Sequence, residues 1–138
     1  MLKPQPIQLP NNKRIIKIIA ENNHTFFCDE DWQWNGCGYS NDGALGLGSF
    51  TSGRVITPTP INLSNGNRVI DIKPGASHTF FLDYHHNWHG CGSNEHGELM
   101  LQREISSQFL PVQISFSNIK RKIEEHAELS RDHVYRMK

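Results

Sequence analysis

The chain has 138 residues, with 14 basic and 14 acidic side chains and a formal net charge of zero. This length predicts one domain that is large enough to bury a core. The balanced charge, with no basic patch, argues against binding of nucleic acid through phosphate contacts. Apolar runs are only a few residues long and the first residues carry no apolar signal segment, so we expect neither a membrane span nor a cleaved secretory signal.

Short apolar segments separated by turn residues fill the first half of the chain. Residues 15–19 are β-branched and nearly alternating, and residues 24–28 are again apolar, so both segments predict strands. The acidic residues 29–31 predict a hairpin turn into a third strand over residues 34–38. No helical period is present in this region, and we therefore expect an all-β fold.

A glycine-rich loop follows the third predicted strand and covers residues 41–48. Residues 49–59 are polar and contain Gly and Pro, which favours a surface connection to the next unit.

The second half of the chain repeats the first at an offset of 54 positions. His-Thr-Phe-Phe at residues 24–27 returns at 78–81, and Trp-x-Gly-Cys-Gly at 34–38 returns at 88–92. Pro-Ile-Gln-Leu at 6–9 likewise returns as Pro-Ile-Asn-Leu, so that 18 of 41 aligned positions are identical. A repeat of about this length is typical of stacked or ring-shaped arrays of like units.

The end of the chain differs in kind from both repeats. Pro-Val-Gln-Ile at residues 111–114 resembles the opening of a third unit, but no further His-Thr-Phe-Phe follows. Residues 120–129 are charged, with acids and bases three to four positions apart, which predicts a solvated helix. We therefore divide the chain into a first repeat at 1–59, a second at 60–110, and a third-repeat stub with a charged, helical tail at 111–138.

The order of these motifs resembles the regulator of chromosome condensation repeat. Residues 77–82 (Ser-His-Thr-Phe-Phe-Leu) and 88–99 (Trp-His-Gly-Cys-Gly-Ser-Asn-Glu-His-Gly-Glu-Leu) carry the resemblance in one copy, and residues 14–48 in the other. The resemblance implies that each repeat forms one blade of antiparallel strands in a β-propeller, which usually has seven blades. Two blades cannot close such a ring, so we expect a partial propeller whose open edges allow self-association.

The resemblance also assigns structural roles within the repeat. Glycines of the Trp-x-Gly-x-Gly motif are expected where strands crowd towards the propeller axis, and the later glycine where a turn needs positive φ. Phe26, Phe27, Phe80 and Phe81 are expected to fill space between blades, and the histidines to hydrogen-bond the backbone between strands. The structural positions are His24, Trp34, Gly36, Gly38, Gly43, His78, Trp88, Gly90, Gly92 and Gly97. The hairpin tips depart from the Asp-Gly of the family, and Trp32 is unusual beside Trp34.

Cysteine and histidine residues raise the question of a metal or disulfide. Cys37 and Cys91 occupy equivalent repeat positions and Cys28 lies in an apolar run, so we interpret all three as packing residues in a reducing compartment. Histidines 85, 86, 89 and 96 near Cys91 are ligand types that suit zinc, but they have no counterparts in the first repeat. We interpret them as a solvated hairpin. No nucleophile or phosphate-loop motif is present, and we expect no enzyme, cofactor or metal.

The resulting hypothesis is a protein-binding module that recognises another protein through loops at the blade edges. The candidate partner-binding residues are Tyr39, Asn41, Asp42, Phe50, Arg54, Asn94, Glu95, His96 and Glu98. One alternative is guanine-nucleotide exchange on a Ran-like small GTPase, and another is a fragment of a larger propeller. We expect an intracellular, cytoplasmic location, with a secreted bacterial effector as the alternative.

Overall fold

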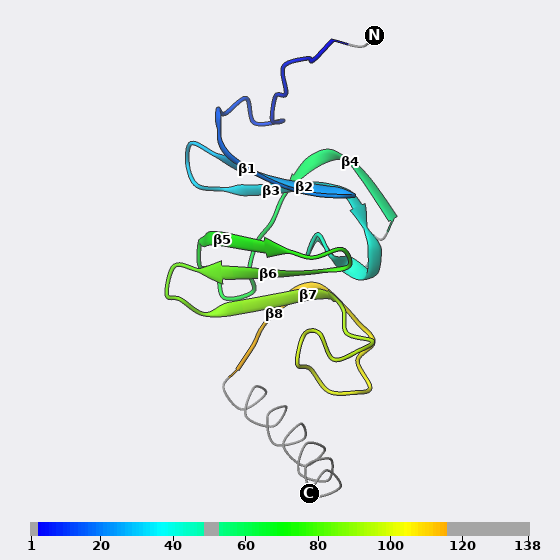
Figure 1. The fold of residues 1–138 in the computed structure, drawn as a ribbon. Coiled ribbons are helices and arrows are strands. Elements are labelled where there is room, and N and C mark those ends of the chain that lie inside the picture. Colours follow the sequence, from blue (N-terminus) through cyan, green and yellow to red (C-terminus); the bar gives the residue numbers. More distant parts are fainter. Residues whose placement is uncertain (1–2, 49–52, 116–138) are drawn as a thin grey trace, which may run out of the picture.

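The computed structural model describes residues 3–48 and 53–115, which form two four-stranded antiparallel sheets. The first sheet has the order β1 (Ile15–Glu21), β2 (His24–Asp29), β3 (Trp34–Ser40) and β4 (Gly53–Pro60). The second has the order β5 (Val69–Pro74), β6 (His78–Asp83), β7 (Trp88–Ser93) and β8 (Ser107–Gln113). The two sheets stack face to face, and a short 3-10 turn η1 (Asn41–Gly43) follows β3 (Figure 1). The all-β fold expected from the sequence is confirmed.

The position of the fourth strand in each sheet was not predicted. Residues 53–59, part of the segment 49–59 interpreted as a surface connection, belong to β4, which pairs with β3. Residues 111–113, interpreted as the opening of a third unit, are the last part of β8 and close the second sheet. The expected limits at 59/60 and 110/111 therefore fall inside strands. The predicted helix over 120–129 lies outside the described residues.

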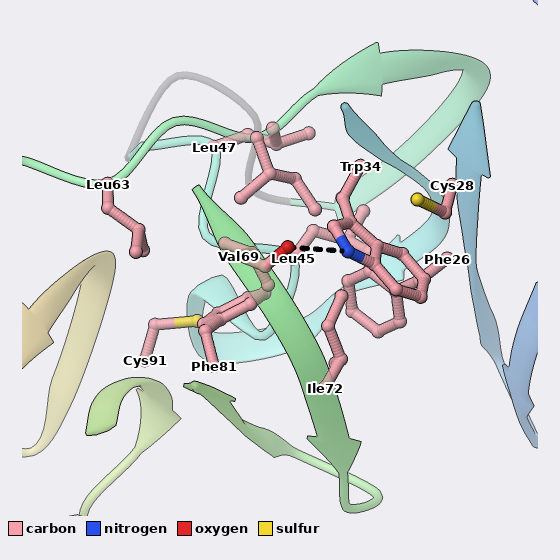
Figure 2. Packing of buried hydrophobic residues seen from close by; sticks show 11 residues of the cluster. Phe26, Cys28, Trp34, Leu45, Leu47, Leu63, Val69, Ile72, Phe81 and Cys91 are labelled. Atoms are coloured by element: carbon pink, nitrogen blue, oxygen red, sulfur yellow. Dashed lines mark hydrogen bonds between the residues drawn. The ribbon is translucent and has the colours of Figure 1, made fainter. Parts of the chain in front are cut away.

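The core of the molecule lies between the two sheets. Phe26 and Phe81 meet edge to face with ring centroids 6.0 Å apart, and both side chains are fully buried. The indole Nε1 of Trp34 donates a 3.0 Å hydrogen bond to the carbonyl oxygen of Val69 across the interface (Figure 2). The expected packing of phenylalanines between blades is thus confirmed for this pair, and the interface combines apolar burial with a directional bond.

A loop of the first unit adds a second set of contacts to this interface. This loop follows β3 and starts at the end of η1, and its residues 43–48 are all buried. The Thr79 hydroxyl donates to the carbonyl oxygen of Ala44 at 2.6 Å, and the Gly48 N–H donates to that of Phe109 at 3.1 Å. The loop therefore joins β6 and β8 of the second sheet to the first unit.

The glycines of the repeat serve several different purposes. A Cβ at Gly38 would collide with the carbonyl oxygen of Asn23, and one at Gly92 with that of Ser77, so both glycines make room for the turn before the middle strand. The expected clash of a Cβ is confirmed at both positions, and the crowding atoms belong to this turn and to the first residue of the middle strand. Gly43 and Gly97 have φ values of +87° and +79°, as expected for their turns.

His24 does not make the expected backbone hydrogen bond. Its ring is buried, and neither ring nitrogen has a hydrogen-bond partner among the described residues. The ring instead packs edge-on against Phe26, with centroids 5.5 Å apart. Burial lowers the pKa of His24, against a smaller opposing effect of Glu21, so the neutral imidazole acts here as an aromatic packing group.

Replacement of Gly43 by alanine should destabilise the protein more than replacement of Gly66. Both glycines have positive φ, so alanine costs about 1–2 kcal/mol at either position. At Gly43 the added Cβ would also lie 2.5 Å from the Phe109 Cα of the other sheet, whereas nothing lies within 4 Å at Gly66. We expect Gly43→Ala to lose about 1–3 kcal/mol more of the free energy of unfolding in urea titrations. Equal losses would show that the loop does not pack against the second sheet.

Candidate functional site

The expected partner-binding residues of the first unit lie near the end of β3. Tyr39 and Arg54 are cross-strand partners in β3 and β4, and both are exposed. Asn41 begins η1, and Asp42 accepts a 3.2 Å hydrogen bond from the Ser107 hydroxyl of the second unit. Phe50 lies outside the described residues. The structure therefore places Tyr39 and Arg54 side by side, while Asp42 helps to join the two units.

The expected residues of the second unit lie in the loop after β7. Asn94 is buried and braces this loop: its Nδ2 donates to the Ile105 carbonyl at 2.7 Å and its Oδ1 accepts from the Leu99 N–H. Glu95 and His96 are exposed, and Glu98 Oε1 accepts from the His96 N–H at 2.7 Å. Burial alone would raise the pKa of Glu98, but hydrogen bonds from backbone N–H groups and from Ser93 outweigh it and lower that pKa. Asn94 therefore has a structural role.

A cleft with mixed chemistry lies elsewhere, between the hairpin tips of the two units. Its volume is about 460 Å³. One wall is the turn between β2 and β3, which carries Asp31 and Trp32; the other is the turn between β6 and β7, which carries Tyr84 and His85. Residues 61–63 and 66–69 form the floor. Both hairpins project from the same side of the stacked sheets (Figure 1).

Trp32 has an unusual backbone conformation at this cleft. Its φ is +64°, a left-handed conformation that bulky residues rarely adopt, and 45% of its surface is exposed. Its N–H donates to the Asp29 carbonyl at 2.9 Å, as the His86 N–H does to that of Asp83 in the second hairpin. Glycine would serve this turn without strain, so the tryptophan is retained there at a cost.

The opposite wall presents an aromatic ring and a cation. The guanidinium of Arg68 lies over the ring of Tyr84, 5.7 Å from its centroid, and Tyr84 is 60% exposed. The Tyr84 N–H also donates to the Arg68 carbonyl at 2.7 Å, which fixes the two residues relative to each other. On the first wall, Asp31 forms an ion pair with Lys13. The cleft therefore offers two aromatic surfaces with charged groups beside them.

Sequence reasoning did not assign Trp32, Arg68 or Tyr84 to a site. The available signal was the departure of both hairpin tips from the Asp-Gly of the repeat, together with the second tryptophan beside Trp34. At such positions the geometry of the turn does not explain why the residue is present.

The cysteines and histidines show little reactive chemistry. All three cysteines are free thiols; burial raises the pKa of Cys28 to about 11, and it also raises the pKa of Cys37 and of Cys91. His89 is fully buried and lies 2.9 Å from the carboxylate of Asp83, whereas His85, His86 and His96 are exposed. Within residues 3–48 and 53–115, no three His, Cys, Asp or Glu side chains gather in a way that could hold a metal ion. The same residues contain no helix long and apolar enough to cross a membrane.

Comparison with known families agrees with the paired sheets. A family model described as the regulator of chromosome condensation (RCC1) repeat matches residues 36–82, which run from β3 to β6. This part of the chain is therefore similar to the regulator of chromosome condensation repeat. Each four-stranded sheet is accordingly a propeller-type blade, and the described residues form two of them.

Similar proteins are much longer than this chain. The human "Probable E3 ubiquitin-protein ligase HERC6" is 26% identical over 111 residues, which are 80% of this chain and 11% of that protein. Human WBSCR16 superposes with a TM-score of 0.66 at 20% identity, over 77% of this chain and 26% of that one. Yeast RCC1 (Prp20), solved bound to Kap60, superposes with a TM-score of 0.67 at 21% identity, over 82% of this chain and 27% of that one. Prp20p of Saccharomyces cerevisiae superposes with a TM-score of 0.64 at 16% identity, over 91% of this chain and 37% of that one. At these identities the structures establish the blade fold.

An aspartate holds the hairpin at the tip of each blade. Asp29 Oδ1 accepts from the N–H groups of Asp31 and Gln33, and Asp83 Oδ1 accepts in the same way from His85 and Asn87. Both carboxylates are buried. Although burial alone would raise the pKa of Asp83, hydrogen bonds from His89, the Asn87 N–H, Asn65 and Asn67 hold that pKa well below its usual value of 3.8.

The Asp83 carboxylate should make folding stability depend on pH in acid. Because its pKa is lower in the folded state, Asp83 stabilises the fold above about pH 4, and this contribution is lost as the pH falls towards the folded value. Asp83→Asn should therefore lower the free energy of unfolding by about 3–5 kcal/mol at pH 7. The difference from the unaltered protein should shrink below pH 4 in urea titrations.

His89→Asn is the matched control, because Asn35 occupies the equivalent position of the first blade. It should cost less than Asp83→Asn and keep part of the acid dependence, because the Asn87 N–H, Asn65 and Asn67 still donate to the carboxylate. An Asp83→Asn variant with an unchanged pH dependence would contradict the role given to this carboxylate.

Proposed function

We propose that this pair of blades is a protein-binding module whose recognition surface is the cleft between the hairpin tips. The observation that carries the proposal is Trp32, a large aromatic residue in a left-handed turn position and exposed at the cleft wall. Residues in such strained backbone conformations cluster at functional sites.

The residue types of the cleft favour a protein segment over a small molecule. Trp, Tyr and Arg are the side chains most enriched at the energetic centres of protein interfaces, and Trp32, Tyr84 and Arg68 supply one of each. Asn62 and Asn67 at the floor offer amide donors and acceptors to a peptide backbone. The partner is therefore a peptide segment with an apolar side chain to insert between the aromatic rings.

The blade-edge loops are the second part of the proposal. Tyr39, Arg54, Glu95 and His96 are exposed, whereas Asp42 and Asn94 use their polar groups within the fold. These loops would extend the contact with a partner, and the cleft would supply its centre. Three free cysteines suit an intracellular setting for such binding.

A Ran-like GTPase is one probe that the comparisons suggest. The structure of Prp20p was described together with its binding to Gsp1p and histones, but this chain covers 37% of that protein. Nucleotide exchange thus stays an alternative, which release of labelled nucleotide from a Ran-like GTPase would test directly.

Trp32→Gly should weaken binding while leaving the protein at least as stable. Glycine relieves the positive φ, so the free energy of unfolding should rise by about 1 kcal/mol. Peptides selected on the unaltered protein from a random phage library should lose affinity for the variant by more than tenfold, which corresponds to about 1.4 kcal/mol. Isothermal titration calorimetry provides the measurement.

His86→Gly is the matched control for this experiment. His86 has the equivalent conformation in the second hairpin, with a φ of +68°, and does not line the cleft. It should gain similar stability and keep the peptide affinity. Equal loss of affinity in both variants, or none in Trp32→Gly, would rule out the cleft as the recognition surface.

A further inference from the structure

Each blade packs on the other with one face, and its opposite face has no packing partner among the described residues. Ile72 of β5 faces the first blade and is 1% exposed, whereas its repeat equivalent Ile18 in β1 is 53% exposed. Trp34 of β3 faces the second blade and is 1% exposed, whereas its equivalent Trp88 in β7 is 37% exposed. Within the described residues, each blade therefore carries a copy of the surface that the other uses for packing.

The unused surface of the second blade already has the docking conformation. Met100 stands at the position of Gly46, with φ values of +58° and +72°. Its N–H donates to the Gly97 carbonyl at 3.0 Å, as that of Gly46 does to Gly43 at 2.9 Å. The loop of residues 97–101 thus keeps the shape of the loop that joins the blades, even though φ is unfavourable for methionine.

The unused surface of the first blade offers the matching donors. In the second blade, Thr79 and Cys91 both direct hydrogen bonds to the carbonyl of Ala44. Their equivalents in the first blade are Thr25 and Cys37, which are cross-strand partners in β2 and β3 just as Thr79 and Cys91 are in β6 and β7.

We propose that a second copy of this chain docks head to tail. The face with Ile18, Thr25 and Cys37 in one copy would receive the face with Trp88 and the 97–101 loop of the next. The occupant is a second copy because the chain carries both complementary halves of an interface that it already forms once within itself. Such a contact is heterologous, so further copies can add at either end.

Charge supports this pairing as well. The register of the strands makes Arg54 equivalent to Ser107, which contacts Asp42 across the blade interface. His96 is the repeat equivalent of Asp42, and it is flanked by Glu95 and Glu98. The head-to-tail arrangement therefore brings Arg54 of one copy towards an acidic loop of the next.

One substitution weakens the contact between copies relative to the contact within the chain. A Cβ at Gly46 would lie 2.9 Å from Pro111 and 3.3 Å from the sulfur of Cys91. Met100 brings such a Cβ to the equivalent place, so the receiving copy must shift to accept it. The association is accordingly reversible and depends on concentration.

Analytical ultracentrifugation of the full chain tests the proposal. The unaltered protein should sediment as larger species as its concentration rises, and Met100→Gly should lower the dissociation constant about tenfold by removing the clash. Sedimentation as a monomer throughout, or a Met100→Gly variant that associates no more tightly, would overturn the proposal.

Two charge variants test the head-to-tail geometry. Ile18→Asp disables one face and Met100→Asp the other; both side chains are partly exposed in the single chain, so folding should be retained. Each variant alone should be monomeric. An equimolar mixture should form dimers and nothing larger, because the Ile18→Asp copy keeps the face with the 97–101 loop and the Met100→Asp copy keeps the face with Ile18. Association of either variant by itself would overturn this geometry.

Tyr84→Asp is the control for a general loss of apolar surface. Tyr84 is exposed at the cleft and belongs to neither docking face, so this variant should assemble like the unaltered protein. Loss of peptide binding with intact assembly would also separate this proposal from the one about the cleft.

Discussion

The packing of one blade on the next is the constraint on which this structure depends. A single four-stranded sheet of this size cannot bury both of its faces, so its stability has to come from a neighbour. Here Phe26 and Trp34 meet Phe81 and Val69, and the backbone of the 43–48 loop bonds to the second sheet. The indole bond of Trp34 matters because it ends on a backbone carbonyl of β5, which fixes the distance between the sheets as well as their contact.

The repeat predicted the first three strands of each blade and missed the fourth, for a physical reason. β4 and β8 contain proline, at Pro58 and Pro60 in one and at Pro111 in the other. Proline argues against a strand inside a sheet because it cannot donate to the ladder, but it is tolerated in an edge strand. β4 and β8 are such edges. Composition alone does not distinguish such an edge strand from a polar connection. The β-branched and aromatic residues of the inner strands, in contrast, clearly predict strands.

The site was harder to predict than the fold because its residues lie in different repeats and do not match one another. Trp32 and Tyr84 are 52 positions apart in sequence and line opposite walls of one cleft. Residues shared by the two copies, such as Trp34 and Gly36, are explained by packing. The aromatic walls of the proposed binding surface, Trp32 and Tyr84, instead lie where the copies depart from each other. A search for matched motifs therefore finds the blades and passes over the surface between them.

The hairpins can vary in this way because the turn of each one is closed by a side chain behind the tip. In each blade a buried aspartate, Asp29 or Asp83, accepts two backbone N–H groups and closes the turn from inside. Trp32 and His86 contribute backbone to their turns and have exposed side chains, so a tryptophan can stand where glycine would fit, at the cost of local strain. Because the buried carboxylates hold the turns, the exposed residues at the tips can differ between blades without loss of the blade fold. A degraded repeat can therefore keep its fold while its surface changes.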